Sequence, residues 1–206
     1  MEFFAVEVYK FTPSGYFGSN TYLIVSDGEA AVVDPSVPFA RLESALGGAV
    51  LKYILLTHCH FDHILKIDDW VEHTAAEVVI GECDRGGLSS PLTNCYGLFL
   101  GVENGYFGRA TGVSDGNRLT VGSAGIEVIS TPGHTAGGVS YLAEGVLFAG
   151  DTVFAGGGYG RCDLPGGDET ALFASIRRLC ELPDDVKVCA GHGEDTTVFE
   201  IKMNFK

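Results

Sequence analysis

A short apolar run, YILL at 53–56, leads directly into the heptapeptide THCHFDH at 57–63. The chain has 206 residues and six histidines, and three of these histidines lie in the heptapeptide beside an aspartate. An apolar run bounded in this way predicts a buried strand, so the polar cluster has to lie where that strand ends. Imidazole and carboxylate groups are good ligands for Zn²⁺ and Fe²⁺. The chain is therefore restricted to folds that bring strand ends and a metal-type cluster to one rim.

The same arrangement occurs at three other places in the chain. IEVIS leads to His134, GVLFAG leads to Asp151, and VKVCA leads to His192. In sheets covered by helices, ligands collect outside the carboxyl ends of the strands, so these side chains are expected to meet at one rim. The candidate metal ligands are His58, His60, Asp62, His63, His134, Asp151 and His192.

Seven donors indicate two ions rather than one. One tetrahedral ion takes about four ligands, whereas seven donors with a carboxylate free to bridge fit two ions roughly 3.5–4 Å apart. The six cysteines form no C-x-x-C pair, which argues against a closed structural zinc site. The alternative is chance accumulation of ordinary core or surface histidines. His73, near the end of a predicted helix, is interpreted in that way, and Cys59 is interpreted as a packing residue.

The rest of the chain predicts one α/β domain over residues 1–206, with two similar halves. Strands are expected at 4–11, 20–26, 29–36, 53–56, 77–80, 118–121, 125–131, 138–143, 145–150 and 186–190, with a hairpin turn at Asp27-Gly28. Helices are expected at 37–48, near 64–73, after Asp168 as N-cap, and at the C-terminal end. Residues 82–117 show no clear period, which is typical of a functional loop or a loosely structured excursion.

Composition restricts the partners. Thirteen Lys+Arg against 27 Asp+Glu give a formal net charge of −14, which would repel nucleic acid and anionic membranes. The stretch MEFFAVEVYK lacks the positive n-region of a signal peptide, and no apolar run approaches the ~20 residues of a membrane span. The cysteines are interpreted as reduced thiols. We expect a cytoplasmic protein that acts on a small-molecule substrate, and the sequence leaves its oligomeric state open.

Five motifs together resemble the metallo-β-lactamase superfamily: THCHFDH, TPGHTAGGVSY, AGDTVF, GRCDLPGGD and AGHG. More narrowly they are similar to the short glyoxalase II-like (hydroxyacylglutathione hydrolase-like) branch, and the resemblance covers most of the chain. It implies a four-layer αβ/βα sandwich, in which two mixed sheets are flanked by helices and the site lies at one rim. It also implies two divalent metal ions, with zinc as the first choice and iron or manganese as alternatives.

The resemblance implies a role for each candidate ligand. The first ion would be held by His58, His60 and His134, the second by Asp62, His63 and His192, and Asp151 would bridge the two. The chain departs from the family where Leu65 replaces a usual glycine and where residues 154–161 are one residue longer. It also stops at Lys206, before the C-terminal helical region with which glyoxalase II holds glutathione. Glutathione thioesters are therefore a weaker expectation than thioesters as a class.

The expected reaction is hydrolysis of a thioester by metal-activated hydroxide, with Asp62 and Asp151 as catalytic residues and Asp62 as a proton acceptor. A thiol leaving group, with a pKa near ~8.5, can leave as thiolate without a strong general acid. Arg161 is a candidate partner for a substrate carboxylate, or a structural arginine paired with a nearby acid.

Three alternatives use the same residues. A persulfide dioxygenase would hold a single iron through His58, His134 and Asp151. A lactonase or phosphodiesterase would use the same two-ion site on another bond. A metal-binding protein without catalysis is disfavoured, because all seven donors are present and an open site is expected.

Overall fold

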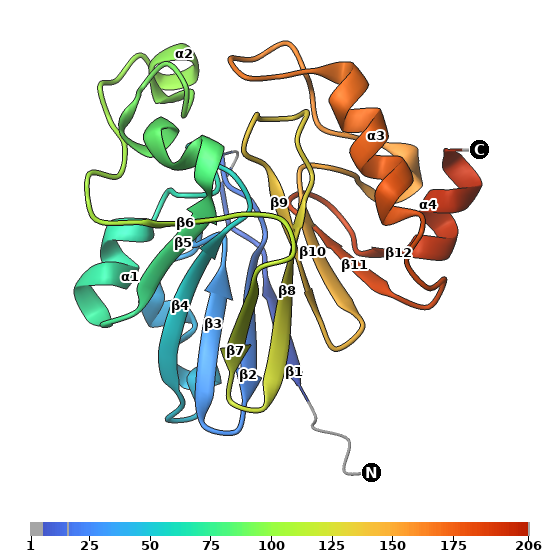
Figure 1. Ribbon diagram of the computed structural model, residues 1–206. Helices are drawn as coiled ribbons and strands as arrows, with labels where there is room; N and C mark the ends of the chain where they lie inside the picture. Colours follow the sequence, from blue (N-terminus) through green and yellow to red (C-terminus); the bar gives the residue numbers. More distant parts are fainter. Residues whose placement is uncertain (1–5, 16, 206) are drawn as a thin grey trace.

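Two six-stranded sheets lie at the centre of the protein, as a computed structural model that describes residues 6–15 and 17–205 shows (Figure 1). The first sheet contains, in spatial order, β1 (Glu7–Phe11), β2 (Thr21–Ser26), β3 (Glu29–Val33), β4 (Val50–Leu56), β5 (Glu77–Gly81) and β6 (Thr111–Val113). The second contains β12 (Thr196–Thr197), β11 (Lys187–Ala190), β10 (Val146–Gly150), β9 (Val139–Ala143), β8 (Ala124–Ser130) and β7 (Arg118–Val121). The helices are α1 (Ile67–His73), α2 (Tyr96–Leu100), α3 (Glu169–Leu179) and α4 (Val198–Asn204), with 3-10 turns η1 (Phe39–Arg41), η2 (Glu43–Leu46), η3 (Glu82–Ser89) and η4 (Ala155–Gly157).

The first sheet changes from antiparallel to parallel pairing at β3. The hairpin between β2 and β3 turns at Asp27 and Gly28, whose φ values of 42° and 77° are those of the predicted tight turn. From β3 to β6 the strands run parallel, which explains the continuous apolar runs EAAVV and YILL. Because parallel strands end at the same edge, the residues that follow β3 and β4 lie side by side.

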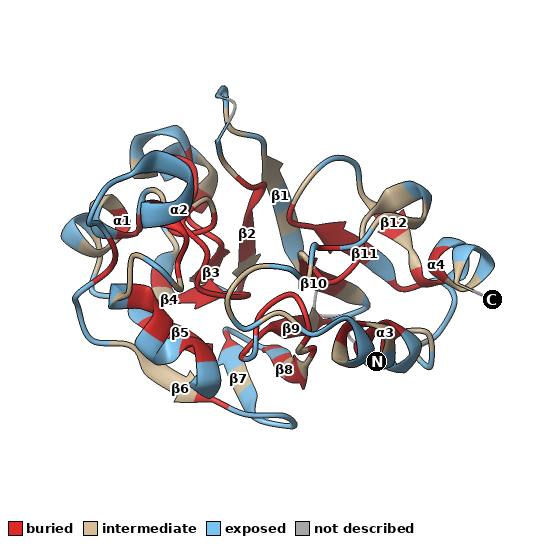
Figure 2. Ribbon diagram, turned by 90° about the horizontal axis from the view of Figure 1, so that it is seen from above, coloured by how far each residue is buried: buried red, intermediate tan, exposed pale blue. Residues whose placement is uncertain are grey.

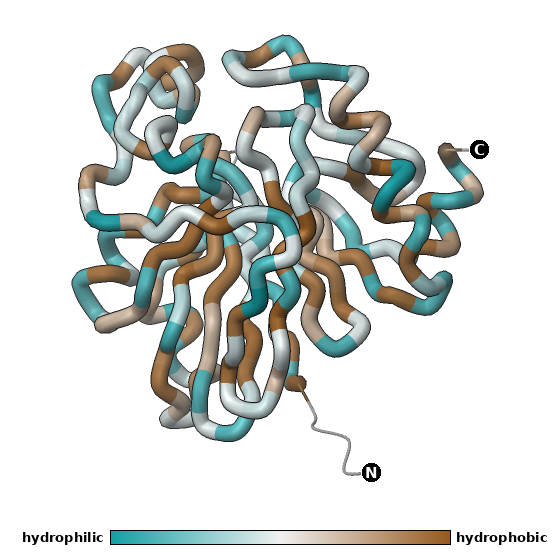
Figure 3. The backbone as a smooth tube through the Cα atoms, in the orientation of Figure 1, coloured by the Kyte–Doolittle hydropathy of each residue, from teal (hydrophilic) through white to brown (hydrophobic). Residues whose placement is uncertain are grey.

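The fold has four layers, because helices cover the outer faces of two packed sheets (Figures 1 and 2). Between the sheets lies a shared core, in which Tyr22 of β2 and Phe148 of β10 meet edge to face at 5.4 Å. Trp70 of α1 packs on the outer face of the first sheet, and Leu172 and Ile176 of α3 pack on that of the second. The most hydrophobic stretches follow the strands (Figure 3). The predicted fold class, two mixed sheets flanked by helices, is confirmed.

Residues 37–48 do not form the predicted helix. The 3-10 turns η1 and η2 take its place, and Leu42 between them has a φ of −109°. The apolar face of the predicted helix comprised Phe39, Leu42, Ala45 and Leu46. The first three are three apart, and in a 3-10 turn residues at this spacing lie above one another. The tighter turn therefore directs the same face toward the core, where Leu42 is fully buried.

The other differences concern short elements and element ends. Residues 82–117 contain η3, α2 and β6, each too short to show a period in the sequence. The two-residue strand β12 was not predicted, and the predicted helix near 64–73 begins at Ile67. Of the strand predicted at 4–11, the first two positions lie outside the described residues, and the strand begins at Glu7. Asp168 caps α3 as predicted, since its carboxylate accepts a hydrogen bond from the Ala171 N–H at 2.9 Å. No helix in the described part of the chain is both long and apolar enough to cross a membrane.

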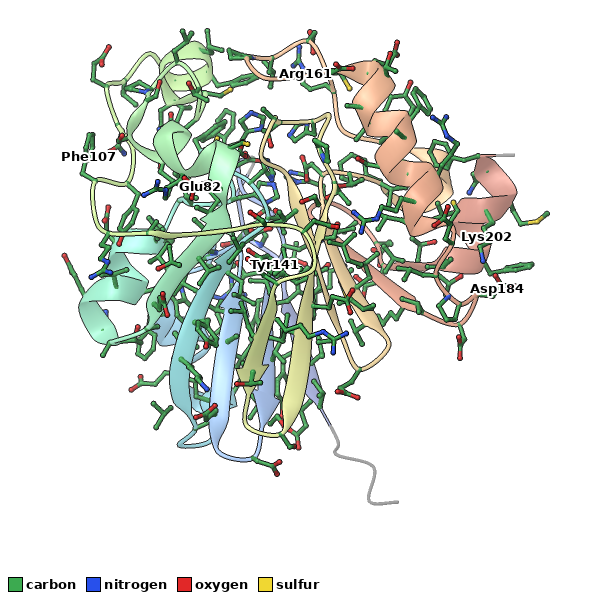
Figure 4. All side chains as sticks on the ribbon, viewed as in Figure 1. Glu82, Phe107, Tyr141, Arg161, Asp184 and Lys202 are labelled. Carbon is green, nitrogen blue, oxygen red and sulfur yellow. The ribbon has the colours of Figure 1, made fainter. Side chains whose placement is uncertain are left out.

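Tyr141 provides a test of how the two sheets are joined. Its buried hydroxyl donates to the Leu56 carbonyl of β4 at 2.9 Å, across the shared core (Figure 4). Tyr141→Phe removes this buried hydrogen bond between the sheets, so we expect the free energy of unfolding to fall by about 1–2 kcal/mol. Thermal melts should show a decrease of about 2–4 °C for each kcal/mol. The matched variant Tyr159→Phe, at a half-exposed ring, should stay within about 0.5 kcal/mol of the parent, and equal losses in both variants would contradict the assignment.

Candidate metal centre

The heptapeptide THCHFDH forms a loop after β4, and bonds from other segments fix its backbone. The Asp84 carboxylate accepts from the Cys59 N–H at 3.1 Å and from the Gly137 N–H at 2.6 Å, so it joins this loop to the one after β8. The Phe61 N–H donates to the Asn94 carbonyl at 2.7 Å. Held in this way, the loop buries its three histidines, His58, His60 and His63.

The remaining candidate ligands reach the same place from loops of the second sheet. Gly133 precedes His134 with a φ of 132°, and a Cβ there would lie 2.2 Å from the backbone of α3, so only glycine fits. Gly191 precedes His192, and a Cβ there would lie 2.2 Å from the Asp151 carboxylate. These glycines let the backbone of each loop come close enough for its side chain to enter the centre.

Asp151 lies between the two groups of histidines. Its Oδ1 atom is 3.3 Å from His63 Nε2, while its Oδ2 atom is 3.7 Å from His134 Nε2 and 3.5 Å from His192 Nε2. The ring nitrogens His60 Nδ1 and His134 Nε2 are only 2.8 Å apart. A carboxylate that faces both groups has the position expected of a bridging ligand.

All seven predicted ligands are brought together. Their donor atoms form three overlapping groups, within each of which all donor atoms lie within 4.8 Å of one another. The groups are His58 with His60 and His134, His58 with His63 and Asp151, and Asp62 with His63 and His192. Predicted non-ligands lie apart: His73 is exposed on α1, where it stacks on Phe39 at 5.0 Å, and Cys59 is a buried thiol outside all three groups.

The donor atoms fit bound cations. Nε2 of His58 and His63 and Oδ1 of Asp151 are buried and have no hydrogen-bond partner, while His60 faces His134 through its Nδ1 atom. A buried polar atom without a partner costs about 1–3 kcal/mol, so several in one place indicate a ligand that satisfies them. Imidazole and carboxylate donors suit zinc, iron and manganese. The residues therefore fit divalent metal ions.

The opposite ring nitrogens are held by a second set of groups. His63 Nδ1 donates to Asp34 at 2.8 Å, His134 Nδ1 donates to the Arg161 carbonyl at 2.7 Å, and His58 Nδ1 donates to the Thr57 hydroxyl at 3.0 Å. Each bond leaves Nε2 as the free, metal-facing nitrogen, as is usual for histidine ligands.

Asp34 was missed by the sequence reasoning. The buried carboxylate accepts from the Thr57 N–H and hydroxyl at 2.8 Å each, as well as from His63. Through Thr57 it also fixes His58, so one carboxylate orients histidines of two donor groups. The signal was present, because Asp34 directly follows the apolar strand EAAVV, in the same way as the predicted ligands follow theirs.

Burial and neighbouring charges set the protonation of the histidines. Burial and the neighbouring histidines lower the pKa of His58. Burial, together with His134, lowers the pKa of His60 to about 3. Both rings are therefore neutral at pH 7, which is the form that binds metal. Burial opposes a charge on His63 as well, but Asp34 and Asp151 outweigh it and raise the pKa of His63. Metal binding would thus displace a proton from His63.

A cavity of about 380 Å³ opens beside this cluster. Its wall includes five of the candidate ligands, His60, Asp62, His134, Asp151 and His192, so the centre is open to a small molecule. Arg161 also lines the cavity, where it forms the pairing with a nearby acid that the sequence left open as the alternative to a substrate contact. Its guanidinium group is paired with Asp163 through two bonds of 2.7 and 2.6 Å, and its carbonyl positions His134.

Asp34→Asn tests the role of the groups that hold the Nδ1 atoms of the histidines. Asn tolerates the left-handed backbone of this position (φ 52°) but cannot accept the bonds of Thr57 and His63 together. We expect metal affinity to fall about 10–100-fold while the metal-free protein keeps its circular-dichroism spectrum. Competition with a chromophoric chelator measures the affinity. The exposed Asp68→Asn serves as the matched control, and an affinity that falls equally in both variants would argue against the role of Asp34.

The comparisons with known proteins agree with this geometry. The family model of the metallo-beta-lactamase superfamily matches residues 14–192. A probable metallo-hydrolase of Bacillus subtilis (strain 168), YqgX, is 32% identical over 191 residues, which are 90% of this chain and 90% of the relative. The hydroxyacylglutathione hydrolase GloC of Haemophilus influenzae is 32% identical over 199 residues and 93% of each chain.

Two solved structures share the fold over almost their whole length. The BLEG-1 B3 metallo-beta-lactamase has a TM-score of 0.86 and 34% identity, and the match covers 94% of this chain and 95% of that one. TTHA1623 in a di-iron-bound form has a TM-score of 0.83 and 29% identity, with 95% and 98% covered. The matched family model, the four-layer fold and the converging histidines and aspartates lead to one conclusion: the chain belongs to the metallo-beta-lactamase superfamily.

Proposed function

We propose that the protein is a hydrolase that holds two divalent metal ions, with zinc as the first choice, and cleaves thioesters of small molecules. Seven donors in three overlapping groups, with Asp151 3.3–3.7 Å from ring nitrogens of His63, His134 and His192, support the dinuclear site. A relative named as a hydroxyacylglutathione hydrolase supports the thioester class at 32% identity. The cavity size of about 380 Å³ suits a small molecule, and six free cysteines suit a reducing, cytoplasmic setting.

The side chains of the centre have distinct tasks in this proposal. When bound, two divalent ions supply Lewis acidity toward a carbonyl oxygen and lower the pKa of a water molecule toward ~7. Asp62 lines the cavity, and its Oδ2 atom lies 3.1 Å from His192 Nε2, so it can accept a proton from an attacking water. Burial opposes its charge, but His63 and His192 outweigh this and lower the pKa of Asp62, which keeps it ionised at pH 7.

The observation that carries the thioester assignment is that no described residue lining the cavity, apart from the metal donors, can readily protonate a leaving group near pH 7. Among the described residues that line the cavity, the titratable groups outside the metal donors are Cys95 and Arg161. Burial, with Asp62 nearby, raises the pKa of Cys95 to about 11, and the bond to Asp163 raises the pKa of Arg161. Neither group delivers a proton readily near pH 7. A thiolate can leave unprotonated, because its conjugate acid has a pKa near ~8.5, whereas an alkoxide cannot do so as easily.

Two assays test the proposal. Zinc-loaded protein should release thiol from S-D-lactoylglutathione or from a simpler acyl thioester. Iron-loaded protein given glutathione persulfide should show no rapid oxygen uptake, since the donors Asp62, His63 and His192 serve a second ion that a single-iron dioxygenase does not need. Oxygen uptake without thioester cleavage would replace the hydrolase with the dioxygenase alternative.

We expect two metal ions per chain in metal-replete protein, because seven donors in three overlapping groups exceed the roughly four that one tetrahedral ion takes. Elemental analysis gives the number, and one ion or none would contradict the dinuclear site. Chelation should also lower the melting temperature, since a ligand at 100 times its Kd stabilises the native state by about 2.7 kcal/mol. A melting temperature unchanged by chelation would show that the ions do not bind this buried cluster.

Three alanine variants separate ligands from bystanders. Asp151→Ala and His134→Ala remove donors and should lower kcat/KM by about 100-fold or more, at least as much as the loss of an outer partner of a metal ligand. Their metal-free spectra should remain those of a folded protein, because these side chains lie at the rim and not in the core. His73→Ala should retain full turnover, and the opposite pattern would show that the ligands are wrongly assigned.

A further inference from the structure

The cavity beside the metal donors has a partly aromatic lining. Four phenylalanines, which we call the aromatic wall, line it: Phe17, Phe61, Phe99 and Phe154. The Phe61 ring lies 6.1 Å from that of Phe17 and 5.7 Å from that of Phe99, and Phe61 itself separates two ligands in the sequence. Phe154 lies 6.1 Å from the ring of His192. A substrate at the metal centre therefore has aromatic rings as its nearest apolar neighbours.

The outer members of the aromatic wall are not covered by the protein. Phe17 is 54% exposed and Phe99 is 45% exposed, although both contact Phe61. Large apolar side chains that stay half exposed around a concave site are typical of a surface that binds an apolar ligand. What covers them has to fit a cavity of about 380 Å³, which is the size of a small molecule.

The segment between β5 and β6 holds Phe99 in place. The five-residue helix α2 lies at the rim toward which β3 and β4 point (Figure 1). Residues in left-handed conformation bound it on both sides, Cys95 with a φ of 67° and Gly101 with a φ of 65°. The Asn94 carbonyl accepts the Phe61 N–H at 2.7 Å, and the Asn94 side chain donates to the Leu88 carbonyl at 3.0 Å. The ring of Phe99 is thereby fixed relative to the ligand loop.

The cavity offers little to a charged substrate. Among the described residues that line it, Arg161 is the one cation outside the metal donors, and it lies near the top of the molecule (Figure 4). Its guanidinium group forms two bonds to Asp163 and lies 5.9 Å from the ring of Phe99. A substrate carboxylate would therefore meet the negative charge of Asp163 beside this cation. The chain's net charge of −14 further disfavours carriers with several carboxylates or phosphates.

We infer that, given the thioesterase activity proposed above, the preferred substrates are uncharged thioesters with an apolar acyl group, and that the aromatic wall selects them. Glutathione and coenzyme A thioesters carry charges, whereas the one cation among the described lining residues outside the metal donors is already paired with Asp163. An alkyl or aryl group instead covers Phe17 and Phe99, and each buried methylene strengthens binding about threefold to fourfold.

A substrate series tests this inference. Zinc-loaded protein is given S-acetyl and S-hexanoyl N-acetylcysteamine, which share an uncharged thiol, and S-D-lactoylglutathione, and kcat/KM is measured for each by thiol release. We expect the hexanoyl ester to exceed the acetyl ester by about tenfold or more, and to exceed S-D-lactoylglutathione as well. Phe99→Ala should lower the hexanoyl-to-acetyl ratio about fivefold, and Phe17→Ala provides a second variant on another segment. Leu98→Ala, a half-exposed neighbour in α2 that does not line the cavity, should keep the parent ratio.

The outcomes separate the two proposals. A higher kcat/KM for S-D-lactoylglutathione, or a hexanoyl-to-acetyl ratio that neither phenylalanine variant changes, would overturn the inference and leave the thioesterase in place. Cleavage of none of the three esters by protein that holds two zinc ions would overturn both.

Discussion

The hydrogen bonds between Asp34 and Thr57 join the fold to the metal centre. They form because β3 and β4 are parallel neighbours that end at the same edge, where the Asp34 N–H donates to the Leu55 carbonyl at 3.0 Å. The Asp34 carboxylate then accepts the backbone N–H and the hydroxyl of Thr57 and the ring N–H of His63. The register of two strands thereby determines the direction of two histidine rings, one of them through Thr57.

The carboxylates enclosed with the histidines make the centre dependent on positive charge. Asp34, Asp62 and Asp151 surround His63, and isolated carboxylates are costly to bury without a partner. Without metal, the balancing charge is the proton that Asp34 and Asp151 hold on His63 by raising its pKa. Divalent ions would replace that proton and satisfy the unpartnered ring nitrogens. The site is thus arranged for cations before any substrate arrives, while the aromatic wall beside it is arranged for an apolar group.

The sequence allowed the seven donors to be named because each follows an apolar strand directly or within a few residues. Strands of the two mixed sheets that end at the same rim convert that local pattern into a spatial cluster, so no long-range contact had to be known. Asp34 also follows an apolar strand, but the bonds that give Asp34 and Asp84 their roles cannot be found from that pattern. Their function depends on which strands are neighbours and on where the loop after β8 lies, as in the 53-residue separation between Asp84 and Gly137. A single sequence does not reveal such pairings.

Local periodicity in the sequence explains which helices and strands were predicted correctly and which were not. The amphipathic α3 and the alternating hairpins were predicted because several turns or residue pairs repeat the pattern. The helix predicted at 37–48 was wrong, since three-residue spacing of its apolar residues suits a 3-10 turn as well. The helix α2 has five residues and no repeat, so neither it nor the position of Phe99 beside the cavity was predictable.

The most direct test of the account is a stepwise titration of metal-free protein with Zn²⁺ while hydrolysis of an uncharged acyl thioester is followed. Because seven donors converge with Asp151 between the histidines of both sheets, activity should rise until two ions per chain are bound and then level off. Full activity at one ion per chain, with no gain from the second, would contradict the dinuclear hydrolytic centre.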